Sequence, residues 1–545
     1  MEYYDILFVI ALAALSVFLW KMADHCDRVK SAKWKLLWLT PAFVAFFFML
    51  LNGYDICLLC AYAAVGVLLL GFFSENKRFR QRLSIAAAGL AVLTVPLCLF
   101  SDVYRRADYT ADFEEMFSEA KKRYVMTKHK NIDWDKLYAE YLPKFKEVTK
   151  NRDEVGNCIL WESFCAEFHD GHVNFAAKES VIDEADERSL GNDYGLVTMK
   201  LSDGRFVALN VDDSLKSYGI HQLTEITSWD GMTVEEAHEK SEYPFKHAYA
   251  DIDNEEFYLG TCAAGVGGDT VKVGFIADDG SEKTVELPKL DSTYSKRLKE
   301  TVDKVNRSYP AANLTFSVAD DDTVCLRMCA MSYDADSDSS EDYGLMKGKL
   351  KRDFLELKES GARDLIIDIR GNNGGSGGIV QAIAELFAPE GEHFYANNPK
   401  WDVMEKRYIK DENDDYIIDC ATTFKGEDIL DGGKIIILVN NKSVSAADHL
   451  TKVMSQFDNV TVMGFTEPNG SAQGVSAIGG NYGALYLSSS AILDEDGGIF
   501  VDSGADRQSS QSLDIKVPFD EEAVHSLFDE DEDYLFELAL KELKK

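Results

Sequence analysis

Two segments of this 545-residue chain each pass from an apolar run through a polar loop into a helical pattern. The first contains the apolar run 364–370 (DLIIDIR), the glycine loop 371–378 (GNNGGSGG) and a helical pattern that Pro389 ends. The second is residues 435–450 (IIILVNNKSVSAADHL). Two strand-loop-helix units predict a mainly parallel sheet, and ligands bind at the carboxyl ends of the strands in such sheets. We therefore expect both loops to meet in one crevice.

The second loop places Ser445 at the turn from strand to helix. A hydroxyl there lies beside the first free backbone N–H groups of the helix, which suits an attacking oxygen and the oxyanion that it creates. The glycine loop has two other readings, a flexible connector and a phosphate cradle. No Gly-Lys-Ser/Thr follows the loop, so the sequence gives a nucleotide site little support. We interpret Ser445 as a nucleophile.

The motifs DIRGNNGG at 368–375 and SVSAAD at 443–448 resemble a known pair of motifs. The pair is LRGNxGG and SASAxE in the serine peptidase family that includes the C-terminal processing (tail-specific) proteases and the tricorn core. The resemblance extends from about residue 107 to the end of the chain. It implies an α/β ClpP/crotonase-like peptidase core over residues 291–545 with Ser445 as nucleophile. The oxyanion hole would be formed by the backbone N–H of Ala446 and that of Gly374 or Gly375.

The first hundred residues differ in character from the rest. Apolar stretches at 4–20, 36–51, 56–73 and 83–100 each have roughly the length that spans a bilayer. The acidic start MEYYD argues against a signal peptide. The loops 21–35 and 77–82 are rich in basic residues, and such loops are expected to be cytoplasmic. Arg105 and Arg106, which follow the fourth stretch, argue against this orientation. We predict four transmembrane helices within residues 1–103 of a multi-pass cell-membrane protein with an extracytoplasmic catalytic domain.

Two modules are predicted between the membrane region and the core. Residues 107–178 form an α-helical cap whose NIDWDKLYAEYLPKF and FHDGHVNF segments look like the tricorn-like branch of the family, and the catalytic histidine of that branch matches His172. Residues 185–290 form a β-rich domain that contains KSYGIHQLTEITSWDGMTVEEA, which is similar to PDZ domains. Such a domain can bind an extended peptide as an added strand, but the usual turn glycine is missing before Glu225. Structural spacing is the alternative role.

The general base separates this sequence from the tail-specific branch. That branch uses a lysine in a GKGxxQ turn, and the matching turn 469–474 (NGSAQG) has Gly470 at the lysine position. A Ser-Lys dyad is therefore not expected, and His172 is the preferred base. His449 follows Ser445 by one helical turn and is interpreted as a packing or surface residue. His169 and His172 could also hold a metal, but no third ligand is suitably spaced.

A histidine base needs an acidic or polar residue that orients it. The tricorn-like branch uses a glutamate in a G-x-x-x-E-x-x-G stretch, which matches Asp502 within residues 498–504. Glu495 and Asp506 are the alternatives. The branch also has a serine beside the histidine, where this chain has Gly171.

These observations together predict a membrane-anchored serine endopeptidase that acts on protein or peptide substrates through an acyl-enzyme, with no metal or organic cofactor. The net charge of −36 argues against nucleic acid as a partner. A catalytically silent peptide- or lipid-binding protein on the same fold is the alternative, because fold does not fix function. A membrane sensor is a third interpretation. The sequence leaves the substrate and the oligomeric state open.

Overall fold

The computed structural model describes residue 78 and residues 108–307, 314–332, 343–359, 361–508 and 511–545. The chain divides into two units, Met1–Asp108 and Tyr109–Lys545. The four predicted membrane-spanning stretches lie outside the described residues. Among the residues that are described, no helix has the length and apolar character needed to cross a membrane.

A six-stranded sheet forms the centre of the second unit, in the order β18-β15-β14-β9-β8-β7. All neighbouring pairs are parallel except β7 and β8, so the prediction of a mainly parallel sheet is confirmed. The strands β9 and β14 are direct neighbours, with Asp368 opposite Leu438 at their carboxyl ends. The strands are β7 (Thr315–Val318), β8 (Thr323–Arg327), β9 (Asp364–Asp368), β14 (Ile435–Leu438), β15 (Val460–Gly464) and β18 (Ile515–Lys516).

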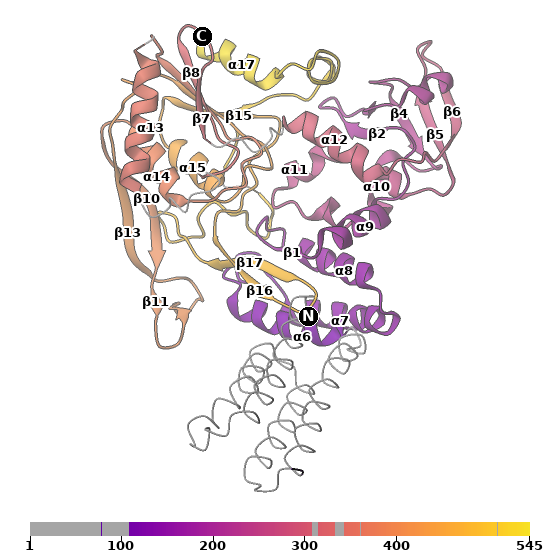
Figure 1. Ribbon diagram of the computed structural model, residues 1–545, viewed down its shortest axis with the longest axis horizontal. Helices are drawn as coiled ribbons and strands as arrows, with labels where there is room; N and C mark the ends of the chain where they lie inside the picture. Colours follow the sequence, from indigo (N-terminus) through magenta and orange to yellow (C-terminus); the bar gives the residue numbers. More distant parts are fainter. Residues whose placement is uncertain (1–77, 79–107, 308–313, 333–342, 360, 509–510) are drawn as a thin grey trace. The chain divides into compact units, whose positions relative to one another are not determined.

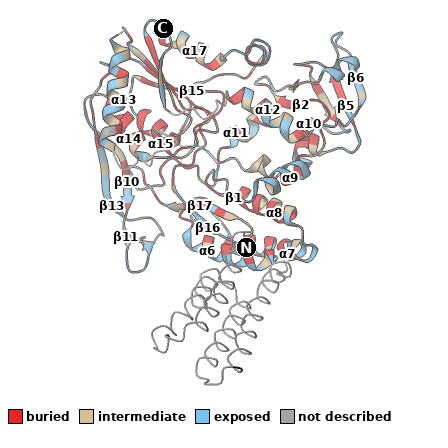
Figure 2. Ribbon diagram, viewed as in Figure 1, coloured by how far each residue is buried: buried red, intermediate tan, exposed pale blue. Residues whose placement is uncertain are grey.

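Helices cover the sheet and bury its apolar side chains. The helices α14 (Gly377–Phe387) and α15 (Ala446–Met454) follow the two central strands and lie side by side (Figure 1). Their core-facing residues are buried (Figure 2), as expected for strands and helices that read as continuous apolar runs. Ser376 begins α14 because its side chain accepts the N–H of Gly378. The other helices of this region are α13 (Tyr343–Lys358), α16 (Glu521–Val524), η5 (His525–Glu530) and α17 (Tyr534–Leu543).

The predicted helical cap is built around aromatic side chains. Its elements are α6 (Tyr109–Arg123), α7 (Trp134–Asn151), α8 (Glu154–Ala166), β1 (Asn174–Ala176) and α9 (Glu179–Leu190). Phe113 stacks on Phe145 with ring centroids 4.2 Å apart, and Trp161 lies against both. The strand β1 joins the cap to the core by pairing with β17 (Ala484–Ser490), which pairs in turn with β16 (Gly474–Gly479). This pairing fixes the chain immediately after His172.

In the β-rich domain, the segment that is similar to PDZ domains forms a short helix, a turn, a strand and a second helix. The 3-10 helix η1 (Asp213–Tyr218) leads through a turn into β4 (Ile226–Trp229), and α10 (Val234–Lys240) follows. Leu223 has φ 65 in that turn, so it adopts the left-handed conformation that a glycine would favour. The remaining elements are β2 (Val197–Lys200), β3 (Phe206–Leu209), η2 (Pro244–His247), α11 (Ile252–Phe257), η3 (Ala263–Gly265), β5 (Thr270–Ile276), β6 (Glu282–Pro288) and α12 (Tyr294–Asn306).

The segment around Gly260 lies between β2 and α10 of this domain. Thr198 of β2 donates its hydroxyl to the carbonyl of Gly260, at 2.5 Å. The N–H groups of Gly260 and Cys262 donate to Nδ1 of His238, which belongs to α10. The chain itself therefore occupies the space between this strand and this helix.

A long antiparallel hairpin projects from the core beside α14 (Figure 1). It consists of β10 (Gly391–Pro399) and β13 (Ile418–Gly426), with the short strands β11 (Trp401–Asp402) and β12 (Arg407–Tyr408) toward its tip. Tyr416 in the hairpin donates its hydroxyl to the carbonyl of Val125, so the hairpin also contacts the cap.

Candidate active site

Ser445 occupies a strained backbone position directly before α15. Its φ is 66 and its ψ is −117, a region that residues other than glycine rarely adopt. Such a conformation projects a side chain from a sharp strand-to-helix turn, as nucleophilic serines in other hydrolase folds do. Ser445 is half-buried, and its hydroxyl makes no hydrogen bond within the described part of the chain.

The glycine loop lies directly against Ser445. A Cβ atom built on Gly374 would be 2.5 Å from the Cβ of Ser445 and 3.0 Å from the backbone nitrogen of Ala446, so no side chain fits at Gly374. The N–H of Gly374 is already bonded to Oδ1 of Asn372, at 2.8 Å. Among the residues that are described, the N–H groups of Gly375 and Ala446 have no acceptor. These two groups are free to receive an oxyanion.

Buried polar side chains connect the glycine loop to the loop before Ser445 where each loop leaves its strand. Arg370 is 3% exposed and donates to the carboxylates of Asp368 and Asp533. Asn440 accepts the N–H of Gly371 at 3.0 Å, and Ser443 donates its hydroxyl to the carbonyl of Ile369 at 2.8 Å. A buried ion pair with satisfied hydrogen bonds holds its surroundings in one geometry. The crevice expected from the sequence is thereby assembled.

His172 is buried on the loop between α8 and β1. Both ring nitrogens are buried and have no hydrogen-bond partner among the described residues. Burial lowers the pKa of His172 below its ordinary value, while the nearby carboxylate of Asp170 opposes the shift. Asp170 itself fixes the loop, because Oδ1 accepts the N–H of His172 and Oδ2 accepts the hydroxyls of Tyr124 and Ser488. His172 is thus a neutral imidazole with both nitrogens available.

The turn 469–472 links the three segments that carry the candidate catalytic residues. The carbonyl of Ser471 accepts the N–H of Ser445, and its hydroxyl accepts the N–H of Gly171, both at 2.8 Å. The N–H of Ala472 donates to Oδ2 of Asp502, at 2.9 Å. Ser445, the loop of His172 and Asp502 therefore all bond to two consecutive residues of one turn.

Gly171 leaves no space for the serine that the tricorn-like branch has there. A Cβ atom on Gly171 would be 1.9 Å from Oδ1 of Asn469. The side chains of Asn469 and Ser471 fill the position beside His172 instead, and the hydroxyl of Ser471 is bonded to Gly171. The turn itself is held by the buried carboxylate of Asp448, which accepts the N–H groups of Gly470 and Ser471.

Asp502 is the buried member of the three candidate orienting residues, whereas Glu495 and Asp506 are exposed. Its Oδ2 accepts the side-chain N–H of Gln473 in addition to the N–H of Ala472, and its Oδ1 is buried without a partner in the described residues. Burial and, to a smaller extent, the charge of Asp170 raise the pKa of Asp502 to about 7. The preceding residue, Val501, has φ 71, which is unusual for a β-branched residue.

His449 packs among aromatic rings on the far side of the first turn of α15. Its ring lies 4.5 Å from that of Tyr395 and 4.7 Å from that of Phe500, measured between centroids. Burial lowers the pKa of His449 to about 4, so the ring is neutral. In the described residues, no group of three or more His, Cys, Asp or Glu side chains is placed to hold a metal ion.

Three residues near the site were not identified from the sequence, and all belong to the segment between α6 and α7. Tyr124 bonds to Asp170, and Nε2 of His129 lies 2.9 Å from the carbonyl oxygen of Asp502. Lys130 is buried and donates to the carbonyl of His169 and to the hydroxyl of Ser503. No local motif marks these residues, because their partners are distant in the chain.

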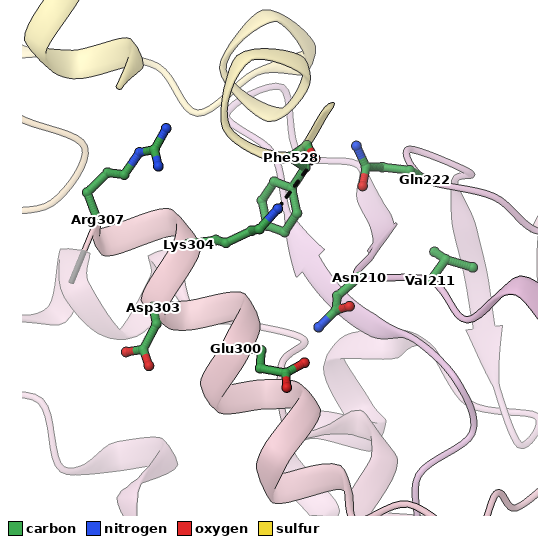
Figure 3. Close-up of a pocket in the computed structure, with 8 residues that line it drawn as sticks. All are labelled: Asn210, Val211, Gln222, Glu300, Asp303, Lys304, Arg307 and Phe528. Carbon is green, nitrogen blue, oxygen red and sulfur yellow. Dashed lines mark hydrogen bonds between the residues drawn. The ribbon is translucent and has the colours of Figure 1, made fainter. Parts of the chain in front are cut away.

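A separate cavity of about 580 Å³ lies where the β-rich domain, α12 and η5 meet (Figure 3). Lys304 points toward Phe528, whose carbonyl accepts its Nζ at 3.4 Å. The cavity is lined by Asn210, Val211, Gln222, Glu300, Asp303, Lys304, Arg307 and Phe528, so it contains none of the candidate catalytic residues.

Comparison with known proteins finds two family models that match parts of the chain. Residues 328–506 match the model described as Peptidase family S41, and residues 105–159 match the Tricorn protease C1 domain. The protein is therefore a serine-type peptidase. The similarity to peptidase family S41 covers about a third of the chain.

Solved structures share the fold at low sequence identity. Mature CPAF is 12% identical with a TM-score of 0.52, over 80% of this chain and 98% of that chain. Mature CPAF complexed with lactacystin is also 12% identical, with a TM-score of 0.51 over 80% of this chain and 99% of that chain. No curated protein matches the sequence.

Proposed function

We propose that the protein is a membrane-anchored endopeptidase in which Ser445 is the nucleophile and His172 is the general base. The observation that carries the proposal is that Ser471 bonds both to Ser445 and to Gly171, the residue directly before His172, together with the strained φ of 66 at Ser445. The free N–H groups of Gly375 and Ala446 beside the serine support an oxyanion hole.

In the proposed reaction, Oγ of Ser445 attacks the peptide carbonyl while a ring nitrogen of His172 takes its proton. The N–H groups of Gly375 and Ala446 donate to the oxyanion of the tetrahedral intermediate. The C–N bond then breaks, and His172 returns the proton to the leaving amine. Water then attacks the carbonyl carbon of the acyl-enzyme while His172 takes its proton. The ester C–O bond breaks, the acid product leaves, and His172 returns the proton to Oγ, which regenerates the Ser445 hydroxyl.

Asp502 is the proposed partner of the imidazolium that forms on His172. Its buried and unpartnered Oδ1 supports this role, because an orienting carboxylate needs one free oxygen. Asp170 is less suitable, since both of its oxygens already accept hydrogen bonds from Tyr124, Ser488 and the backbone of His172.

The activity is tested with the full-length protein in detergent or nanodiscs, using an unstructured protein such as casein as substrate. Wild type should cleave the substrate, whereas Ser445→Ala and His172→Ala should each lose activity by a similar factor, because residues that act as one unit are not additive. A Ser445→Ala protein that cleaves at the wild-type rate would contradict the proposal. A silent binder would be inactive even as wild type.

The membrane anchor is proposed from the four apolar stretches within residues 1–103 and from the basic loops between them. In this topology the peptidase domain faces away from the cytoplasm. After the native Cys26 and the exposed Cys420 are replaced by serine, single cysteines introduced in the loop 21–35 and at the exposed Lys240 test it with a membrane-impermeant thiol reagent. Intact cells should label the cysteine at 240 and not the loop cysteine. The opposite pattern would reverse the topology, and release of the protein by alkaline carbonate would remove the anchor.

A further inference from the structure

Lys130 is a buried cation between the two loops that carry His172 and Asp502. It is 7% exposed, and its Nζ donates to the carbonyl of His169 at 2.7 Å and to the hydroxyl of Ser503 at 3.0 Å. His169 lies three positions before His172, and Ser503 directly follows Asp502. One side chain from the cap therefore bonds to both loops.

Lys130 makes no ion pair within the described part of the chain, although charges surround it. Burial lowers the pKa of Lys130, and the carboxylates of Asp170 and Asp502 oppose that shift. Arg507 is the other nearby cation, but it already donates to Glu255. The charged and titratable groups that face Lys130 come from three segments. They are His129 from its own segment, His169 and Asp170 from the loop of His172, and Asp502, Asp506 and Arg507 from the loop after β17.

A buried ammonium is costly unless it stabilises neighbouring negative charge. Here the neighbouring carboxylates are Asp170 and Asp502, and the charge of Asp170 together with burial raises the pKa of Asp502. Among the groups that lower the pKa of Asp502, Lys130 has the largest effect, followed by the hydrogen bonds from Ala472 and Gln473. Tyr124 and Asp448 also face these carboxylates.

We propose that Lys130 is a positioning residue of the active site: its ammonium group joins the His172 loop to the Asp502 loop, where its charge favours the ionised form of the Asp502 carboxylate. This inference rests on the proposed roles of His172 and Asp502. It assigns to the cap segment 124–130 a direct part in arranging the catalytic groups. Lys130 does not bond to Ser445 and carries no proton in the reaction.

The test compares Lys130→Met, Lys130→Arg and Lys128→Met by the pH dependence of kcat in the full-length protein. Lys128 is the matched control, since it lies on the same segment but forms an exposed ion pair with Asp415. Lys130→Met should move the acidic limb of kcat upward by about one pH unit, which is a roughly tenfold loss below the limb. Lys130→Arg keeps the charge and should retain most of the activity and the wild-type limb, and Lys128→Met should match wild type.

A Lys130→Met protein with the wild-type limb would overturn the inference. Equal loss of activity in Lys130→Arg and Lys130→Met would also overturn it, because the positive charge would then not be what the site requires. If Lys130→Met does not fold, Ser503→Ala removes one of its two anchoring bonds and should shift the limb in the same direction, while an unchanged limb would refute the proposal. Failure of the proposed function is distinguishable, since it leaves His172→Ala or Asp502→Asn active.

Discussion

The carbonyl oxygen of Ser471 accepts the backbone N–H of Ser445 at 2.8 Å. Because the hydroxyl of Ser471 also accepts the N–H of Gly171, the position of the nucleophile depends on the same residue as the position of the His172 loop. Ser471 takes no part in the proposed chemistry. Its effect on catalysis is therefore geometric.

Replacing Ser471 with alanine removes the bond to Gly171 and keeps the backbone bond to Ser445. One hydrogen bond contributes about 1 kcal/mol, so we expect a Ser471→Ala protein that folds but loses roughly tenfold in kcat through a misplaced His172. Ser455→Ala is the control, since that exposed hydroxyl bonds only to the carbonyl of Lys452. Equal kcat values for the two variants would exclude a positioning role for Ser471.

The glycine loop offers a test that separates backbone strain from a clash with the nucleophile. Gly374 and Gly371 both have positive φ, but only a Cβ at Gly374 would meet Ser445. We expect Gly374→Ala to lower kcat by about 10²-fold or more, the usual loss when an oxyanion site is disturbed. Because both positions have positive φ, Gly371→Ala should lower the stability about as much as Gly374→Ala does. It should leave kcat unchanged. Peptide cleavage and thermal unfolding measure the two effects.

His449 should matter for folding and not for chemistry. It is buried between Tyr395 and Phe500, so His449→Ala opens a cavity that we expect to cost about 1–3 kcal/mol of unfolding free energy. His449→Phe should restore much of the stability. Both variants should keep the wild-type kcat per folded molecule when denaturant unfolding and active-site titration are measured together. A loss of kcat in both would make His449 a catalytic residue.

The acidic limb of the pH profile should report Asp502. Burial lowers the pKa of His172 below 6.5 and raises that of Asp502 to about 7, so the carboxyl loses its proton at higher pH than the imidazole. If ionised Asp502 orients His172, kcat should rise with pH through about 7. The Asp502→Asn variant should keep only low activity, and the pH profile of that activity should lack this limb. A limb near 7 that persists in Asp502→Asn belongs to another group.

The same shift predicts how stability depends on pH. The folded pKa of Asp502 lies above its unfolded value, so the protonated group stabilises the fold at low pH and this contribution is lost as pH rises through about 7. Asp502→Asn cannot ionise, so at pH 8 its free energy of unfolding should exceed that of wild type by at least about 1 kcal/mol. Its unfolding temperature at pH 8 should be correspondingly higher. At pH 5 the difference in free energy of unfolding should be smaller. A lower stability of Asp502→Asn at pH 8 would contradict this reasoning.

The two central strands and the serine turn could be read from the sequence because their signals are local. Apolar runs bounded by glycine or serine loops define β9 and β14, and strand parallelism follows from the helices between them. The choice between Gly374 and Gly375 could not be read, since it depends on the side chain of Asn372 accepting one of the two N–H groups.

The roles of Tyr124, His129 and Lys130 could not be predicted from the sequence for a different reason. Tyr124, His129 and Lys130 lie between two amphipathic helices, where tyrosine, histidine and lysine are ordinary surface residues. Their burial arises when the cap docks onto the core through β1 and β17. Gly171 in place of the serine of the tricorn-like branch was visible in the sequence, whereas the contacts of Asn469 and Ser471 with Gly171 required the three-dimensional structure.

The central claim is that Ser445 is the nucleophile activated by His172. The most direct measurement is peptide mapping by mass spectrometry after reaction of the full-length protein with a fluorophosphonate. We expect one covalent adduct on Ser445 in the wild type, none in Ser445→Ala, and an adduct that forms at least about 10²-fold more slowly in His172→Ala. An adduct on another serine that accompanies cleavage activity, or unchanged labelling of Ser445 in His172→Ala, would contradict the claim.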